Sequence, residues 1–203
     1  MQYRSLTRQT PPNVEPVSLA EAKAHLRVDS DTSDAEIAAM ISAAREWVET
    51  YLDRTLVTTQ WAMRLDKFPP DSLDDIELPR PPVATEGTAT AVSITYTLEA
   101  GGTAALATNQ FRVDRHSTPG AVKTLYAGTW PSHMDDDNSI TITWYAGYGA
   151  SGSSVPAAIK HAMLMLIGFW YENRSAVLVG SISKGLEYAV ESLLSSHRWG
   201  SYK

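Results

Sequence analysis

The chain has 203 residues, of which 43% are hydrophobic and 20% charged, values typical of a globular protein with enough apolar side chains for a core. Its formal net charge of −6 excludes a general nucleic-acid binder, because neutralising phosphates requires clustered Lys and Arg. The absence of cysteine excludes disulfides, thiolate nucleophiles and zinc sites built on Cys.

The N-terminal third of the sequence predicts an extended arm followed by helices. Residues 1–15 carry two arginines and a pair of prolines and are expected to form an extended arm. Ser18 with Glu21, and Ser33 with Glu36, are each spaced as a capping box, which marks a helix start. Apolar residues then recur at spacings of three and four, which predicts an amphipathic helix of about five turns that ends near Leu52.

The middle of the chain changes to the alternating pattern of half-buried strands. The stretches "TQWAMRL", "VSITYTLEAGGTAAL" and "SITITWYAGYG" alternate in this way. Gly101-Gly102 suits a hairpin turn, and Pro119-Gly120 is expected to join a further pair of strands, "QFRVD" and "AVKTLY". Antiparallel strands without intervening helices predict a small sheet or sandwich.

The stretch "VPAAIKHAMLMLIGFWYENR", residues 155–174, is the most apolar part of the chain. Its uninterrupted apolar run is about half of the ~20 residues that a membrane span requires, so we expect no membrane association. A helix that is apolar nearly all round is expected to be buried on several sides. We expect it to face its own bundle on one side, and a neighbouring subunit could cover another. The following "LEYAVESLLSSHRW" predicts an amphipathic helix near the C-terminus.

No motif in the sequence predicts catalysis. G-x-x-x-x-G-K-[ST], H-E-x-x-H and G-x-S-x-G are absent. Asp135-Asp136-Asp137-Asn138 and the acidic stretch "PPDSLDDIELP" could ligate a hard cation, but they lack the spacing of a calcium loop, so solvated loops are favoured. We therefore expect no catalytic residue, metal or cofactor. The rival hypothesis is a small hydrolase that uses His161, Glu172 or the Asp135–Asp137 cluster.

Six stretches, taken in order, resemble the head–tail connector (adaptor) family of tailed phages and of phage-derived gene transfer agents. The resemblance covers most of the chain, with only a loose match over residues 86–138. The matching stretches are "PVSLAEAKAHLRVD", "DAEIAAMISAAREWVETYLDRTLVTTQW", "IELPRPPV", "ITWYAGYG", "VPAAIKHAMLMLIGFWYENR" and "VESLLSSHR".

The resemblance implies an α+β fold: a helical bundle of the connector type with an inserted antiparallel β region and a C-terminal docking segment. Together with the patterns above, it divides the chain into four parts. These are the extended N-terminal arm (1–15), the helical bundle (16–57 and 155–178), the inserted β region (58–154) and the C-terminal arm or helix (179–203).

The resemblance also implies a structural virion protein without catalysis. Such connectors form a ring, usually of twelve subunits, between the portal protein and a stopper or other tail-proximal protein. DNA would pass through the channel without specific binding, and no small-molecule substrate is expected. The expected location is the neck of a virion or phage-like particle, assembled in the host cytoplasm.

Two sets of contact residues follow from the resemblance and the helical patterns. The portal-docking set is Leu186, Val190, Leu193, Leu194, Arg198 and Trp199. The subunit-interface set is Lys160, Leu164, Ile167, Tyr171 and Arg174.

An alternative is another neck or tail component, such as a stopper or tail terminator. Those proteins are usually dominated by strands, whereas about half of this chain is predicted to be helical. The proportion of helix therefore favours a connector.

Overall fold

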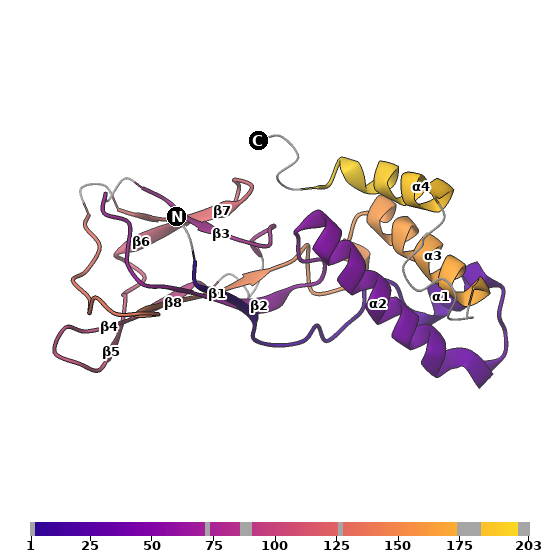
Figure 1. Cartoon of the computed structure of the whole chain (residues 1–203), viewed down its shortest axis with the longest axis horizontal. Coiled ribbons are helices and arrows are strands. Elements are labelled where there is room, and N and C mark those ends of the chain that lie inside the picture. Colours follow the sequence, from indigo (N-terminus) through magenta and orange to yellow (C-terminus); the bar gives the residue numbers. More distant parts are fainter. Residues whose placement is uncertain (1–2, 72–73, 86–90, 126–127, 174–183, 199–203) are drawn as a thin grey trace. The chain divides into compact units, whose positions relative to one another are not determined.

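The computed structural model describes residues 3–71, 74–85, 91–125, 128–173 and 184–198 (Figure 1). The chain forms two compact units, each built from two separate segments. One, called the β unit here, comprises Met1–Pro12 and Thr58–Tyr148. The other, the helical unit, comprises Asn13–Val57 and Gly149–Lys203.

The β unit contains a five-stranded and a three-stranded sheet in which all neighbouring strands are antiparallel (Figure 1). The larger sheet has the order β1-β2-β8-β4-β5 and the smaller one β3-β7-β6. The strands are β1 (Ser5–Arg8), β2 (Thr59–Leu65), β3 (Ile76–Leu78), β4 (Ser93–Thr97), β5 (Thr103–Ala105), β6 (Phe111–Asp114), β7 (Gly120–Thr124) and β8 (Ile140–Ala146).

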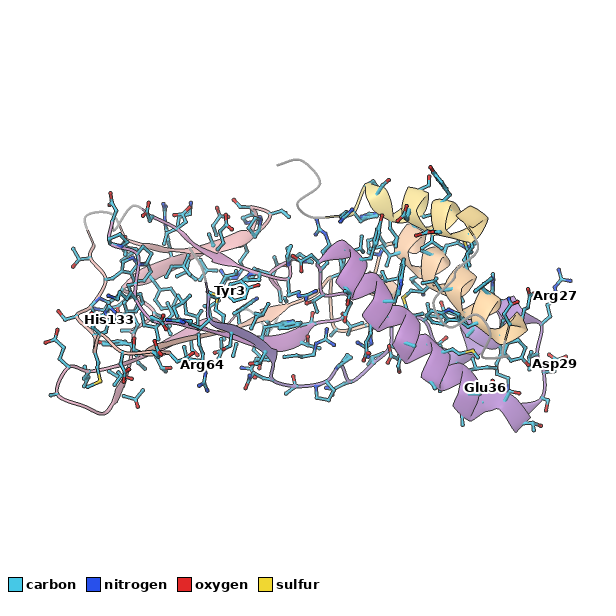
Figure 2. The ribbon with its side chains drawn as sticks, in the orientation of Figure 1. Tyr3, Arg27, Asp29, Glu36, Arg64 and His133 are labelled. Carbon is cyan, nitrogen blue, oxygen red and sulfur yellow. The ribbon has the colours of Figure 1, made fainter. Side chains whose placement is uncertain are left out.

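Residues from both sheets form one buried core, so the β unit is a sandwich. Alternate residues of β8, from Ile140 to Ala146, are fully buried, as the sequence pattern predicts for a strand with one face on a core. Arg64 of β2 lies on the opposite face and is exposed to solvent (Figure 2). The β4–β5 hairpin turns through Gly101 and Gly102, whose φ angles of 84° and 87° favour glycine.

Strands β1 and β3 were not predicted from the sequence. The segment expected as an extended arm instead places Ser5–Arg8 at the edge of the larger sheet, where Leu6 pairs with Met63 and packs against the core. Both strands are short and pair with segments far away in the sequence. The local pattern is therefore too weak to reveal them.

The helical unit contains α1 (Leu19–Leu26), α2 (Asp34–Leu52), α3 (Ala157–Glu172) and α4 (Lys184–Ser195), with short 3₁₀ turns at Asp31–Ser33 and Gly152–Ser154 (Figure 1). Helix α3 contacts α1, α2 and α4. Three helices of the same chain therefore cover much of the apolar surface of α3, while Leu164 and Tyr171 remain half-buried.

One of the two predicted capping boxes is present. The Ser18 hydroxyl accepts a hydrogen bond from the Glu21 amide, and the Glu21 carboxylate accepts one from the Ser18 amide at 2.8 Å. The prediction for Ser33 was wrong, since its side chain makes no capping bond. Ser30 caps a 3₁₀ turn just upstream instead, and α2 continues directly from that turn.

Helix is less abundant than the sequence suggested. The four α-helices of the described chain have 8, 19, 16 and 12 residues, nearer a quarter of the 203 residues than a half. The proportion of helix therefore no longer separates a connector from a strand-rich neck protein. No helix within the described ranges is long and apolar enough to cross a membrane.

Candidate interaction surfaces

The residues named for a hydrolase do not form a catalytic constellation. His161 lies in the second turn of α3 and Glu172 is its last residue, about 16 Å away along the helix axis at the rise of an α-helix. In the β unit, Asp135 pairs with Lys67 at 2.8 Å and Asp137 with Arg4 at 3.2 Å. Among the described residues, no group of three or more His, Asp or Glu side chains is placed to hold a metal ion.

The predicted portal-docking residues fall on both faces of α4. Val190 and Leu194 are fully buried, and Leu186 and Leu193 are half-buried. Because α4 packs on α3, the apolar face of α4 belongs to the core of the helical unit. Trp199 lies outside the described residues.

The residues that follow α4 are fixed to the C-terminal end of α2 and the segment just after it. Arg54 Nε donates a hydrogen bond of 2.5 Å to the His197 carbonyl. The Arg198 guanidinium lies 5.1 Å from the ring centroid of Tyr51, a cation–π distance. Tyr51 in turn stacks on Trp47 with ring centroids 5.4 Å apart. The i, i+4 spacing of Trp47 and Tyr51 is the signal in the sequence that indicates this aromatic pair.

The outward face of α4 remains open within the described chain. Tyr188 is 77% exposed, the most exposed of the large apolar side chains given by the structure. Glu187 beside it is also exposed. An exposed aromatic residue on a rigid helix is a typical contact residue of protein interfaces.

The predicted subunit-interface residues of α3 are only partly accessible. Ile167 is fully buried and Lys160 forms an ion pair of 2.6 Å with Glu21 of α1. Leu164 and Tyr171 are half-buried. Arg174 lies outside the described residues.

The Lys160–Glu21 pair has a clear electrostatic effect. The hydrogen bond from Lys160, assisted by the amide of Ser18, lowers the pKa of Glu21 from 4.5 to about 2. The pair joins α1 to α3 and keeps the carboxylate charged.

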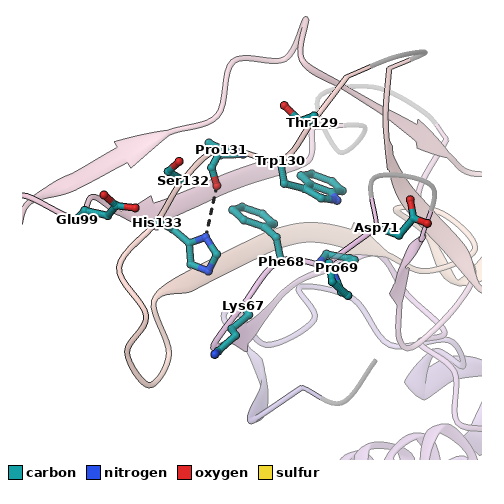
Figure 3. A pocket seen from close by; sticks show the side chains of 11 residues that line it. Lys67, Phe68, Pro69, Asp71, Glu99, Thr129, Trp130, Pro131, Ser132 and His133 are labelled. Atoms are coloured by element: carbon teal, nitrogen blue, oxygen red, sulfur yellow. Dashed lines mark hydrogen bonds between the residues drawn. The ribbon is translucent and has the colours of Figure 1, made fainter.

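A groove of about 790 Å³ opens in the β unit between the segments that follow β2 and precede β8 (Figure 3). Phe68 and Trp130 stack in parallel with centroids 4.9 Å apart, and His133 meets Phe68 edge-on at 5.2 Å. Nothing in the local pattern indicates that these residues meet.

Comparison with known proteins gives one family match, over residues 16–80. This segment matches the model described as "Phage gp6-like head-tail connector protein". A search of curated proteins gave no match.

Three solved structures share the fold over nearly the whole chain. One is a neck of an empty gene transfer agent (GTA) particle computed with C6 symmetry, with 22% identity and a TM-score of 0.75 over 96% of this chain and 95% of that one. A virion of a native GTA particle gives 23% identity and a TM-score of 0.74 over 95% of this chain and 94% of that one. A neck of a native GTA particle computed with C12 symmetry gives 23% identity and a TM-score of 0.73 over 96% of this chain and 94% of that one.

These matches confirm the family resemblance and the α+β fold class. Residues 16–80 match the gp6-like head-tail connector family, and the chain has, over nearly its whole length, the fold of chains found in GTA particles and their necks.

Proposed function

We propose that this protein is a structural head–tail connector, an adaptor that forms a ring in the neck of a phage or gene transfer agent particle. The observation that carries the proposal is the shared fold, which extends over 96% of the chain to neck structures computed with C6 and C12 symmetry. The gp6-like match supports the same assignment. The C12 neck favours a ring of twelve copies. The ring would lie between the portal protein and a stopper or other tail-proximal protein.

A closed ring requires two different faces of the subunit to meet. Helix α2 offers one of them, since it exposes a row of small side chains at helical spacing: Ala35, Ala38, Ala39 and Ala43. Such side chains let another helix approach closely. The half-buried Leu164 and Tyr171 of α3 offer apolar surface for the opposing face. We propose that these two faces meet between neighbouring subunits.

The portal contact is proposed for the outward face of α4 and its C-terminal end. Val190 and Leu194 hold α4 on its own unit, so the accessible contact residues are Tyr188 and Arg198 together with the exposed parts of Leu186 and Leu193. This proposal drops the buried Val190 and Leu194 from the predicted docking set and adds Tyr188, so that every contact side chain can be reached without unfolding the helical unit.

The charge of the chain suits a passive channel for DNA. A net charge of −6 disfavours tight binding of phosphates, which would slow the passage of the genome. The absence of a catalytic constellation among the residues named above is also consistent with a structural role.

The test is co-assembly with the cognate portal, read by mass photometry and negative-stain microscopy. Three chains are compared: the full-length protein, a truncation that ends at Gly185, and Tyr188→Ala. Because the truncation removes the buried Val190 and Leu194, its folded state is checked by circular dichroism. Tyr188→Ala changes only an exposed side chain.

We expect the full-length protein to form rings of about twelve copies on the portal, and both altered chains to bind more weakly. Equal binding by all three would retain the connector role and move the contact to the rest of the helical unit or the N-terminal strand. No binding by the full-length protein would refute the adaptor role. Binding to a preassembled portal–connector complex alone would instead indicate the alternative, a stopper or tail terminator.

A further inference from the structure

We propose that the groove in the β unit binds a basic, proline-containing extended segment of a partner protein. The groove is lined by residues from two parts of the chain that are far apart in the sequence: Lys67–Asp71 and Thr129–His133, with Glu99 beside them (Figure 3). Its volume of about 790 Å³ lies in the range of sites that enclose a compact ligand segment. The inference does not depend on ring assembly.

The lining favours an extended peptide. Trp130 and Phe68 form a stacked pair, and Pro69, Pro70 and Pro131 lie alongside it. Grooves lined by aromatic side chains are the usual receptors for polyproline II segments, whose rings pack on aromatic surfaces. Such segments form no internal backbone hydrogen bonds, so their carbonyls are available to a donor of the receptor.

Trp130 supplies such a donor. Its indole Nε1 has less than 1 Å² of accessible surface and no hydrogen-bond partner in the described structure. In Figure 3 this nitrogen is on the side of the ring that faces Asp71. A buried indole N–H normally has a partner, because an unsatisfied buried donor destabilises the folded state. A ligand carbonyl that displaces the surrounding side chains would satisfy it.

The surrounding charges specify a basic ligand. Asp71 and Glu99 lie at opposite ends of the groove in Figure 3, and both are exposed. The two acidic stretches of the sequence flank the lining segments, with Asp74 and Asp75 after the first and Asp135–Asp137 after the second. Three of these carboxylates are paired, Asp135 with Lys67, Asp75 with Lys123 and Asp137 with Arg4, so the excess negative charge comes from the other acidic residues, which include Glu99, Asp74 and Asp136. An acidic field of this kind attracts and orients Lys and Arg side chains.

The experiment measures fluorescence anisotropy with three labelled synthetic decapeptides. One contains repeated Arg-Pro-Pro, one has the same arginines separated by Gly and Ser, and one contains repeated Glu-Pro-Pro. We expect the first peptide to bind at micromolar concentrations, and the other two to bind about tenfold more weakly or worse, which corresponds to about 1.4 kcal/mol.

Two variants assign the binding to the groove. Trp130→Phe keeps an aromatic ring and removes the N–H donor, and we expect an approximately fivefold loss of affinity for the Arg-Pro-Pro peptide. Glu99→Gln removes an exposed charge and should weaken binding and its dependence on salt. Trp47→Phe and Glu187→Gln are the matched controls in the helical unit and should leave binding unchanged.

Three results would overturn the proposal. The first is no binding of the Arg-Pro-Pro peptide to the full chain. The second is equal binding of both basic peptides, which would indicate charge attraction without recognition of proline. The third is unchanged affinity in Glu99→Gln and in a folded Trp130→Phe, which would move the binding to another surface. Glu99 lies on an exposed turn, so this variant remains informative if Trp130→Phe fails to fold.

Discussion

Arg45 Nε of helix α2 donates a hydrogen bond of 2.8 Å to Glu15, in the segment that precedes helix α1. Only 5% of Arg45 is exposed, and its guanidinium also lies 3.2 Å from the equally buried Glu49. Glu49 in turn accepts a hydrogen bond from the Leu56 amide at 2.9 Å. Burial alone would lower the pKa of Arg45, but the carboxylates of Glu15 and Glu49 outweigh it and raise the pKa. This buried cluster connects three segments of the helical unit.

Replacement of Arg45 by Met should strongly destabilise the helical unit. The change leaves the buried Glu49 without its cationic partner, and loss of one partner from a buried ion pair typically costs about 3–5 kcal/mol. Urea unfolding followed by circular dichroism measures the change. The control is Glu46→Gln. Glu46 is exposed, and its contact with Arg45, at 3.5 Å, is longer than those of Glu15 and Glu49. Equal stability of Arg45→Met and the native chain would show that the cluster contributes no net stability.

Substitution of Ser18 and of Ser33 should distinguish the serine that caps a helix from the serine that does not. Ser18→Ala removes the bond to the Glu21 amide and should lower the free energy of unfolding by about 1 kcal/mol. Ser33→Ala removes no capping bond and should change it by less than about 0.5 kcal/mol. Thermal unfolding of the two variants side by side gives the comparison. A larger loss for Ser33→Ala would contradict the observed helix start.

The Glu21–Lys160 pair should make the stability of the helical unit depend on pH in the acid range. The pKa of Glu21 is about 2 in the folded chain, below its ordinary 4.5. The unfolded chain therefore binds the proton first, and the contribution of the pair is complete above about pH 4.5 and lost as the pH falls towards 2.

Glu21→Gln provides the measurement. The variant should unfold at lower urea than the native chain at pH 7, and the difference should shrink as the pH falls from about 4.5 to 2. Since the Glu21 side chain is 46% exposed, solvent screening keeps the effect small. The control is Glu187→Gln, on the exposed face of α4. A difference that stays constant between pH 7 and pH 2 would rule out the pair as its origin.

Substitutions at Leu194 and Tyr188 of α4 should act on different properties, the first on stability and the second on portal binding. Leu194→Ala removes a fully buried side chain and should cost about 2–5 kcal/mol. Tyr188→Ala, at a position 77% exposed, should change stability by less than about 0.5 kcal/mol while weakening portal binding. Urea unfolding and portal co-assembly test both variants. Normal stability of Leu194→Ala would indicate that α4 is not part of the folded core in solution.

The helix α2 and the alternating strands show what local sequence determines. The spacing of apolar residues predicted the end of α2 at Leu52, and alternation located β2 and β8, because both patterns arise from the geometry of the element itself. The Gly101-Gly102 turn is local for the same reason. The prediction that Ser33 caps α2 was wrong because Ser30, with the 3₁₀ turn that it caps, competes with Ser33 for the same helix start. The sequence pattern gives no measure of that competition.

The sequence alone determined that α3 is a buried helix, that the chain combines helices with antiparallel strands, and that it resembles a head–tail connector. Tertiary structure decided which elements cover α3, since an apolar side chain does not specify its neighbour. It also decided that Val190 and Leu194 lie inside the helical unit while Tyr188 lies outside. The groove shows the same limit, because the rings of Phe68 and Trp130, which are far apart in the sequence, stack with centroids 4.9 Å apart only in the folded β unit. Periodicity is a property of one element, whereas a surface is made by several elements that the sequence does not place next to one another.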